Sequence, residues 1–201
     1  SRAAANHLAL PADRARVITL HLGNGASACA VSGGRSVDTS MGLTPLAGLV
    51  MGTRSGDMDP GALLHLLRSG ITVDELDTLL NKASGMKGLA GENDLRQVHA
   101  AAERGDAAAE AALQVYVHQI RHYVGAYLLE LGGVDALVFT AGVGENDYRV
   151  RAAVCEGLAN LGIVLDPHLN AATRGPEVVV DVSAAYSAVR VLVVPTNEEL
   201  E

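Results

Sequence analysis

Short apolar stretches come first along the chain, and apolar positions at helical spacing follow. Two segments rich in apolar and β-branched residues, 16–22 and 26–31, and a shorter one at 35–38 are separated by glycine turns at 23–25 and 33–34. Short segments of this kind joined by tight turns are typical of consecutive antiparallel strands. The chain is therefore expected to open its sheet with three such strands.

Helix signals dominate the middle of the chain. Asp59 and Pro60 form an N-cap and first-turn pair. Thr72 and Glu75 have the spacing of a capping box, which predicts a helix through Asn81. The strongest helical period predicts a helix from Asp106 to Leu131 that ends at two glycines, and its apolar positions are Leu113, Val117, Ile120, Val124, Leu128 and Leu131. The Ala-rich stretch 100–112 is expected to be helical, and residues 39–59 and 85–91 are expected to be loops.

The last third alternates between strand and helix signals. A buried strand is predicted at 136–139, a loop at 140–146, a helix over 147–161, and two more strands at 177–181 and 190–194. This order indicates an α/β domain with a mixed sheet.

Composition and charge narrow the function classes. Apolar residues make up 49% of the 201 residues, enough for a core, and 22 glycines favour close packing and flexible loops. The net charge is −8 and the pI is near 5.3. Nucleic acids and anionic membranes require a cationic face, so neither is expected as a partner.

Short sequence signals give expectations for the cellular location of the protein and for whether the chain is a fragment. Residues 1–10 lack the apolar segment of a signal peptide, and no apolar run approaches the ~20 residues of a membrane span. Cys29 and Cys155 lack the spacing of a metal site or redox pair, which suits a reducing cytoplasm. Helical signals begin at Ser1 and again after Pro195, so the chain is expected to be a fragment.

Two glycine-rich loops are candidate ligand sites. Residues 21–27 form a turn whose backbone N–H groups could face phosphate oxygens, although the spacing alone favours a plain hairpin that needs no ligand. Residues 140–146 follow a buried strand and precede a helix, a common position for nucleotides, and the alternative is an ordinary strand–helix connection.

Charged residues supply three further candidates. Arg54 lies among Gly, Thr and Ser and could neutralise a transferring phosphoryl group, or it could pair with Asp57 or Asp59. A carboxylate in residues 196–199 could bind Mg²⁺, or its acids could simply favour a helix N-terminus. Residues 94–96 alone indicate no more than a surface ion pair.

Together and in this order, these loops resemble the acetate kinase family. The resemblance rests on HLGNGAS (21–27), MGLTPLAGLVMGTRSGDMDPG (41–61), DLR (94–96), FTAGVGEN (139–146) and PTNEE (195–199), and it extends over the whole chain. It implies an α/β, ribonuclease-H-like fold of the actin-like ATPase type, with a mixed five-stranded sheet flanked by helices. It also implies a helical insertion at about 41–104 and an absent amino-terminal domain.

The resemblance also implies roles for individual residues. The turn of His21, Leu22, Gly23, Asn24 and Gly25 would bind ATP phosphates, and Arg54 would stabilise the transition state. Asp94, Leu95 and Arg96 would contact the nucleotide, as would the adenosine loop of Gly142, Val143, Gly144, Glu145 and Asn146. Glu198 would bind Mg²⁺ or Mn²⁺, with Glu199 as the alternative register.

The family's reaction is reversible phosphoryl transfer between ATP and acetate, giving ADP and acetyl phosphate. The resemblance implies a cytoplasmic homodimer that acts in acetyl-CoA biosynthesis. Propionate kinase, a non-catalytic actin- or Hsp70-like nucleotide module, and an interaction domain with glycine turns are the alternatives. Because the family's amino-terminal domain supplies much of the carboxylate pocket, the 201 residues alone are expected to be inactive.

Overall fold

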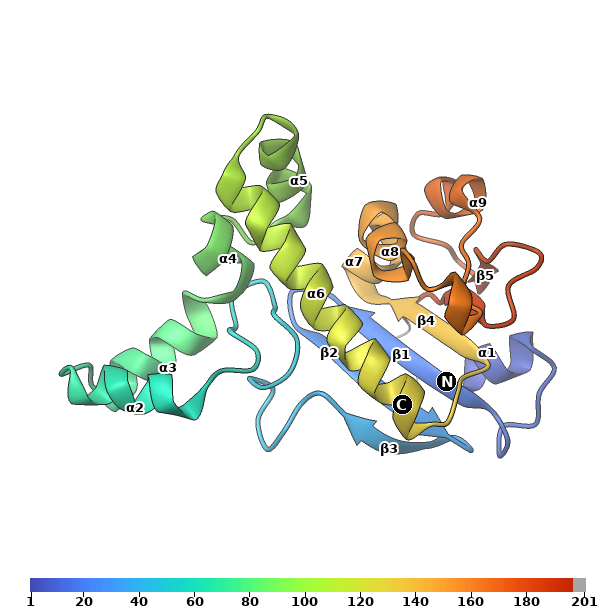
Figure 1. Ribbon diagram of the computed structural model, residues 1–201, viewed down its shortest axis with the longest axis horizontal. Coiled ribbons are helices and arrows are strands. Elements are labelled where there is room, and N and C mark those ends of the chain that lie inside the picture. The colour runs from blue at the N-terminus through green and yellow to red at the C-terminus, as the bar shows by residue number, and fades with distance from the viewer. Residues whose placement is uncertain (197–201) are drawn as a thin grey trace. The chain divides into compact units, whose positions relative to one another are not determined.

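The computed structural model describes residues 1–196, which form two compact units (Figure 1). The first unit comprises Ser1–Gly23, Ser27–Thr39 and the chain from Ile120 onward. The second comprises Asn24–Ala26 and Ser40–Gln119. The turn at 21–25 therefore contributes to both units.

A mixed six-stranded sheet forms the centre of the first unit. Its strands are β1 (Arg16–Leu22), β2 (Ala26–Ser32), β3 (Arg35–Thr39), β4 (Ala136–Thr140), β5 (Val180–Asp181) and β6 (Arg190–Val193). Their order is β3-β2-β1-β4-β6-β5; β1, β4 and β6 run parallel, whereas β3 and β5 pair antiparallel with their neighbours. The α/β class and mixed sheet are confirmed. All six predicted strand segments form strands, one more than the five that the resemblance implied, and the strand predicted at 177–181 is shortened to the two-residue edge strand β5.

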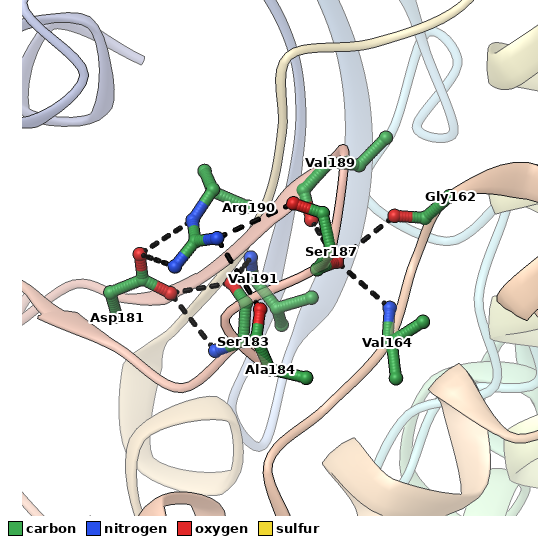
Figure 2. Close-up of polar contacts among 9 residues, drawn as sticks. All are labelled: Gly162, Val164, Asp181, Ser183, Ala184, Ser187, Val189, Arg190 and Val191. Carbon is green, nitrogen blue, oxygen red and sulfur yellow. Dashed lines mark hydrogen bonds and ion pairs between the residues drawn. The ribbon is translucent and has the colours of Figure 1, made fainter.

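A network of side-chain hydrogen bonds attaches β5 and the chain that follows it to β6 (Figure 2). Asp181 accepts a hydrogen bond from Nε of Arg190 at 2.7 Å, and the hydroxyl of Ser183 accepts one from the Val191 N–H at 2.7 Å. The Ser187 hydroxyl donates to the Val189 carbonyl at 2.6 Å. Side chains thus supply the contacts that two residues of strand cannot.

The three parallel strands carry the core of the sheet. All described residues of β4 except Thr140 are buried, as are Val191, Leu192 and Val193 of β6. Strands buried on both faces are typical of a parallel sheet covered by helices. One cover is α1 (Arg2–His7), which packs alanines against β1, β4 and β6.

Three short helices follow β4 in the first unit: α7 (Ala141–Asn146), α8 (Tyr148–Cys155) and α9 (Pro167–Ala172). The prediction of a loop at 140–146 was wrong, because the chain turns directly from β4 into α7, which contacts β1 and β4. The helix predicted to reach Leu161 ends at Cys155, because Gly157 adopts a left-handed φ of 72°. The chain then forms a 3-10 turn at Ala159–Leu161.

The second unit is helical. Its helices are α2 (Pro60–Arg68), α3 (Val73–Lys82), α4 (Gly85–Ala90), α5 (Leu95–Glu103) and the first part of α6 (Ala107–Glu130). The Asp59 cap of α2 and the Thr72–Glu75 capping box of α3 are confirmed. The prediction of a loop at 85–91 was wrong. The first N–H groups of α4 donate to the Met51 and Gly52 carbonyls, and these tertiary bonds outweigh the poor helix propensity of its glycines.

Helix α6 contributes to both units. Its period was correctly predicted, but its most buried face lies slightly around the helix from the predicted one: Leu113, Val117 and Leu128 are half-buried. The fully buried positions are Ala109, Ala112, Tyr116, Ile120, Val124 and Tyr127. Tyr116 and Tyr127 belong to this face, and the predicted stripe did not include them. The Ala-rich stretch 100–112 is helical apart from a break at Gly105, whose φ is 84°.

The two cysteines and the lengths of the helices bear on the expected chemistry and location. Cys29 and Cys155 are both free thiols, and burial raises the pKa of the Cys155 thiol to about 12. No helix within residues 1–196 combines the length and apolar character needed to cross a bilayer.

Candidate functional site

In the first unit, two predicted ligand loops leave the sheet at the same edge. His21 and Thr140 are paired residues at the ends of the parallel strands β1 and β4. The glycine turn begins at His21 and the adenosine loop (residues 142–146) begins just after Thr140. Ligands of open α/β sheets bind at the carboxyl ends of their parallel strands. Leu22 is buried, whereas His21 and Gly23 are half-buried.

The adenosine loop forms the short helix α7, and its two glycines differ in surroundings. Gly142 is exposed, and a Cβ there would meet no atom within 4 Å. A Cβ on Gly144 would come within 3.3 Å of the Phe139 carbonyl carbon. Gly142 thus leaves room for a ligand, whereas Gly144 lets the helix pack on β4. Asn146 closes the loop by donating from its side-chain amide to the Gly142 carbonyl at 2.9 Å.

A buried arginine holds this loop from within the protein. Arg151 in α8 is completely buried, and its guanidinium donates to the carbonyls of Gly144 and Glu145 at 2.8 and 3.0 Å. It also donates to the side chain and carbonyl of Asn170 and to the Thr173 carbonyl, at 2.7, 2.9 and 2.7 Å. Burial lowers the pKa of Arg151 to about 10, so the group is still charged at neutral pH.

The carboxylate of Glu145 accepts two hydrogen bonds from Thr196, one from the backbone N–H and one from the hydroxyl, at 2.8 and 2.7 Å. Val143, the remaining member of the loop, is half-buried. The predicted adenosine loop is thus fixed at its glycines, its amide and its acid.

In the second unit, the rest of the glycine turn lies beside the predicted catalytic arginine. Nη1 of Arg54 lies 3.2 Å from where a Cβ of Gly25 would be. The neighbouring Asn24 accepts the Gly52 N–H on its carbonyl at 2.9 Å. Its side-chain oxygen accepts from the Asn93 amide at 3.3 Å. The structure thus brings the turn, Arg54 and the start of α5 together.

Arg54 is held by neutral groups. Its Nη1 donates to the Pro45 carbonyl at 3.3 Å and lies 3.8 Å from the Met51 sulfur. Asp57 accepts from the Gly48 N–H at 2.8 Å and from the Gln119 amide at 3.2 Å, and Asp59 caps α2. These contacts give both acids a structural role and favour the reading of Arg54 as a residue available for an anionic ligand.

Residues 94–96 form the first turn of α5. Asp94 is the N-cap, Leu95 is buried, and Arg96 is exposed and pairs with Asp94 at 2.6 Å. Hydrogen bonds from Arg96 hold the pKa of Asp94 below its ordinary value. A surface ion pair, the alternative weighed from sequence, is therefore present. It lies next to Asn93, which contacts the glycine turn.

The predicted metal ligand Glu198 and its alternative Glu199 lie outside the described residues. Within residues 1–196, no group of three or more His, Cys, Asp or Glu side chains could hold a metal ion. Glu145 is the acid within the adenosine loop, and its carboxylate accepts a hydrogen bond from the Thr196 N–H.

Sequence reasoning missed Arg151, Thr140 and Thr196. Arg151 carries a signal, since it lies on the buried face of α8 with Val150 and Val154, where an ordinary surface arginine would not fall. Thr196 lies within the motif 195–199, whose acids were the predicted metal ligands. Thr140 likewise lies within the motif 139–146, where the glycines and the acid–amide pair were the predicted ligand contacts.

Comparison with known proteins shows which family the chain resembles. The acetokinase family model matches residues 1–201. The acetate kinase of Leifsonia xyli subsp. xyli is 61% identical over all of this chain and half of its own length. The acetate kinase of Corynebacterium jeikeium is 56% identical over 96% of this chain and 48% of its own length.

Solved structures show the same relationship. A crystal structure of Porphyromonas gingivalis acetate kinase has a TM-score of 0.94 at 45% identity and matches 98% of this chain and 49% of its own. A propionate kinase from Francisella tularensis subsp. tularensis has a TM-score of 0.90 at 42% identity and matches 100% of this chain and 50% of its own. The chain therefore spans about half the length of the relatives it matches.

Proposed function

Because the chain belongs to the acetokinase family, we propose that it is the nucleotide-binding part of an acetate kinase, which transfers the γ-phosphoryl group of ATP to acetate. The supporting observation is the pairing of His21 with Thr140. Because of this pairing, the glycine turn and the adenosine loop begin side by side at the carboxyl ends of β1 and β4. Gly25 and Arg54, close together in the second unit, add the phosphate-binding chemistry.

Each loop has a distinct role in this proposal. The adenosine loop, residues 142–146, binds adenosine, and residues 94–96 contact the same nucleotide. The turn at 21–25 offers backbone N–H groups to the phosphates. Arg54 offsets charge on the transferring phosphoryl group, the role for which a planar, permanently charged guanidinium is suited. Glu198 binds Mg²⁺ or Mn²⁺, which neutralises phosphate charge when bound.

The acceptor and the partners belong to the whole protein. Acetate is favoured by the names of the curated relatives, and propionate is the alternative because one similar structure is a propionate kinase. We further propose that residues 1–201 form one domain with a helical insertion at about 41–104. An amino-terminal domain completes the cleft in a cytoplasmic homodimer that supplies acetyl phosphate for acetyl-CoA biosynthesis.

Nucleotide binding by the 201-residue chain tests the first part. We expect MgADP or MgATP to raise the melting temperature, since ligand at ~100 times its Kd adds about 2.7 kcal/mol to stability. Gly144→Val should abolish the shift, because its side chain would press on the Phe139 backbone. Gly125→Val is the matched control, since a Cβ there meets nothing within 4 Å. An equal shift in wild type and Gly144→Val would contradict the assigned loop.

Activity tests the second part. The chain alone should not form acetyl phosphate, whereas the chain joined to the amino-terminal half of the Leifsonia xyli acetate kinase should do so. In the joined protein, Arg54→Ala should lower kcat by at least ~10³, the lower end of values for catalytic arginines. Parallel assays with acetate and propionate compare the two acceptors. A joined protein that folds and binds MgADP but transfers no phosphoryl group would contradict the kinase assignment.

A further inference from the structure

We propose that Glu145 acts on the nucleotide site as a positioning residue, through Thr196: its carboxylate orients the Thr196 hydroxyl, which fixes the backbone where the adenosine loop leaves β4. This inference rests on the proposed function, because it assigns Glu145 a role within the same loop. It replaces the expectation that Glu145 contacts the nucleotide itself.

Two hydrogen bonds commit one oxygen of Glu145 to Thr196. The Thr196 N–H donates to Oε1 at 2.8 Å, and the Thr196 hydroxyl donates to the same oxygen at 2.7 Å. A hydroxyl has one proton, so the Thr196 oxygen has only its two lone pairs left for other partners. The Glu145 side chain therefore sets the orientation of that hydroxyl.

Both lone pairs of the Thr196 hydroxyl oxygen accept hydrogen bonds from residues just before the adenosine loop. The Ala141 N–H donates to it at 2.8 Å. The Thr140 hydroxyl lies 2.9 Å from it and must be the donor, because the Thr196 proton is already given to Glu145. One hydroxyl thus makes three hydrogen bonds, and all three link the end of β4 and α7 to the segment after β6.

The contact falls where the backbone needs support. Ala141 is a buried residue with a φ of 65°, in the left-handed region. That conformation is unfavourable for a residue other than glycine, and it persists only where the surroundings enforce it. The hydrogen bond from the Ala141 N–H to Thr196 satisfies a buried donor that the turn removes from the strand ladder.

The path of the chain explains why Thr196 is the partner. Strands β4 and β6 are parallel neighbours, and the Val194 N–H donates to the Phe139 carbonyl at 2.9 Å. The chain therefore still follows β4 when it reaches Thr196. The proposed metal ligand Glu198 comes two residues later in the sequence. Holding Thr196 fixes the origin of the adenosine loop.

A double-mutant cycle on Glu145→Ala and Thr196→Val tests the proposal, with two measurements on the 201-residue chain. Hydrogen exchange of the Ala141 amide in the ligand-free chain reports the contact directly. Calorimetric Kd values for MgADP report its effect on the site. We expect each single variant to raise both the exchange rate and the Kd at least ~10-fold, and the double variant to be no worse than the worse single variant.

Conservative variants separate positioning from direct contact. Glu145→Gln keeps an oxygen that can accept both bonds, and Thr196→Ser keeps the hydroxyl, so both should stay within about threefold of wild type. Glu177→Ala removes an exposed acid of the same unit and serves as the control. Exchange at Ile18, in the centre of β1, should stay unchanged in every variant and so exclude global unfolding as the cause.

Three results would overturn the proposal. They are an unchanged Ala141 exchange rate in both single variants, Kd effects that multiply in the double variant, and a Glu145→Gln variant as weak as Glu145→Ala. The last would show that the charge itself contacts the ligand. If wild type binds no MgADP at all, the proposed function fails for the isolated chain, whereas the exchange arm still decides the role of Glu145.

Discussion

The two units hold their candidate ligand-binding segments in place by different means. In the first unit, the adenosine loop is held by side chains that reach it from other elements, namely Arg151 from α8 and Thr196 from the segment after β6. In the second unit, the arginine loop (residues 40–59) is held by its own Asp57 side chain and by backbone packed on backbone, where glycines leave no room for a side chain.

The backbone contacts of the arginine loop are close. A Cβ on Gly56 would lie 2.6 Å from the carbonyl oxygens of Gly48 and Leu49. One on Gly85, at the start of α4, would lie 2.2 Å from the Met51 carbonyl oxygen and 2.6 Å from that of Arg54. Carbonyl groups cannot swing aside as a side chain can, so these contacts fix the backbone on both sides of Arg54.

This difference predicts how each loop fails. A loop held by side chains loses hydrogen bonds when one partner is removed, and its backbone groups are left unsatisfied. A loop held by close backbone packing is insensitive to the chemistry of distant side chains, but one added methyl group forces the backbone apart. Substitutions can therefore break either loop selectively.

The largest effect is expected from Gly56→Ala. Its φ of 71° is costly for alanine, and the methyl group would overlap two carbonyl oxygens. We expect a loss of about 4 kcal/mol in the free energy of unfolding, from about 1–2 for the left-handed conformation and 1–3 for overpacking. Urea denaturation measures this change.

Gly91→Ala is the matched control for Gly56→Ala. Gly91 has nearly the same φ, 75°, but a Cβ there meets nothing within 4 Å. It should cost only the conformational part, about 1–2 kcal/mol. Equal losses at the two positions would mean that backbone packing adds nothing to the arginine loop.

The next largest effect is expected from Arg151→Met in the first unit. Methionine fills much of the volume but leaves five hydrogen-bond acceptor sites without their donor. Unsatisfied buried groups cost about 1–3 kcal/mol each before relaxation, so we expect a net loss of about 3 kcal/mol in urea denaturation. MgADP binding should weaken too, because the carbonyls of Gly144 and Glu145 lose their anchor.

Arg149→Met tests whether charge or burial causes that loss. Arg149 lies on the same helix but is exposed, with its guanidinium 5.7 Å from the Tyr148 ring centroid. Its removal should cost no more than about 1 kcal/mol, the upper end for an exposed cation–π contact. Comparable losses for the two arginines would remove the special role assigned to Arg151.

The same contrast explains which features could be predicted from the sequence. Local signals succeeded: the capping box at Thr72, the N-cap at Asp59 and the glycine turn at 33–34 each depend on neighbours in sequence. Both residues of that turn have positive φ, 58° and 75°, as a tight hairpin requires.

Tertiary contacts account for the failures. Helix α4 forms because Met51 and Gly52 accept its first N–H groups, and α7 forms because Thr196 accepts the Ala141 N–H. No pattern within either segment contains these partners. The candidate loops themselves were found from sequence because glycines and a lone arginine mark them. The residues that hold the adenosine loop were missed, since Arg151 and Thr196 act from other elements.

The smallest effect is expected on the free energy of unfolding when the pH is lowered. The comparison is between Asp181 in the first unit and Asp94 in the second. Burial alone would raise the pKa of Asp181, but hydrogen bonds from Ser183 and Arg190 outweigh it and hold the pKa below its ordinary value. Asp94, paired with Arg96, also has a lowered pKa, but it lies at the surface. Both carboxylates therefore favour the folded state only while they are ionised.

The sign follows from linkage. Because the folded pKa of Asp181 lies below the unfolded value, the stabilisation is fully present above the unfolded value of about 3.8 and is lost as pH falls through the folded pKa. Asp181→Asn should therefore lower the free energy of unfolding at pH 7 by on the order of 1 kcal/mol and flatten its decline below pH ~4. Urea denaturation between pH 2.5 and 7, with the range chosen to bracket about 3.8, measures both changes.

Asp94→Asn should change far less at either pH, because asparagine caps a helix as well as aspartate does and an exposed ion pair contributes little. The two variants remove the same charge beside an arginine and differ mainly in burial and in the network drawn in Figure 2. If Asp94→Asn flattened the fall in the free energy of unfolding below pH ~4 as much as Asp181→Asn does, that result would mean that exposed ion pairs cause the fall. The side-chain network that attaches β5 would then have no special share in the acid stability of the first unit.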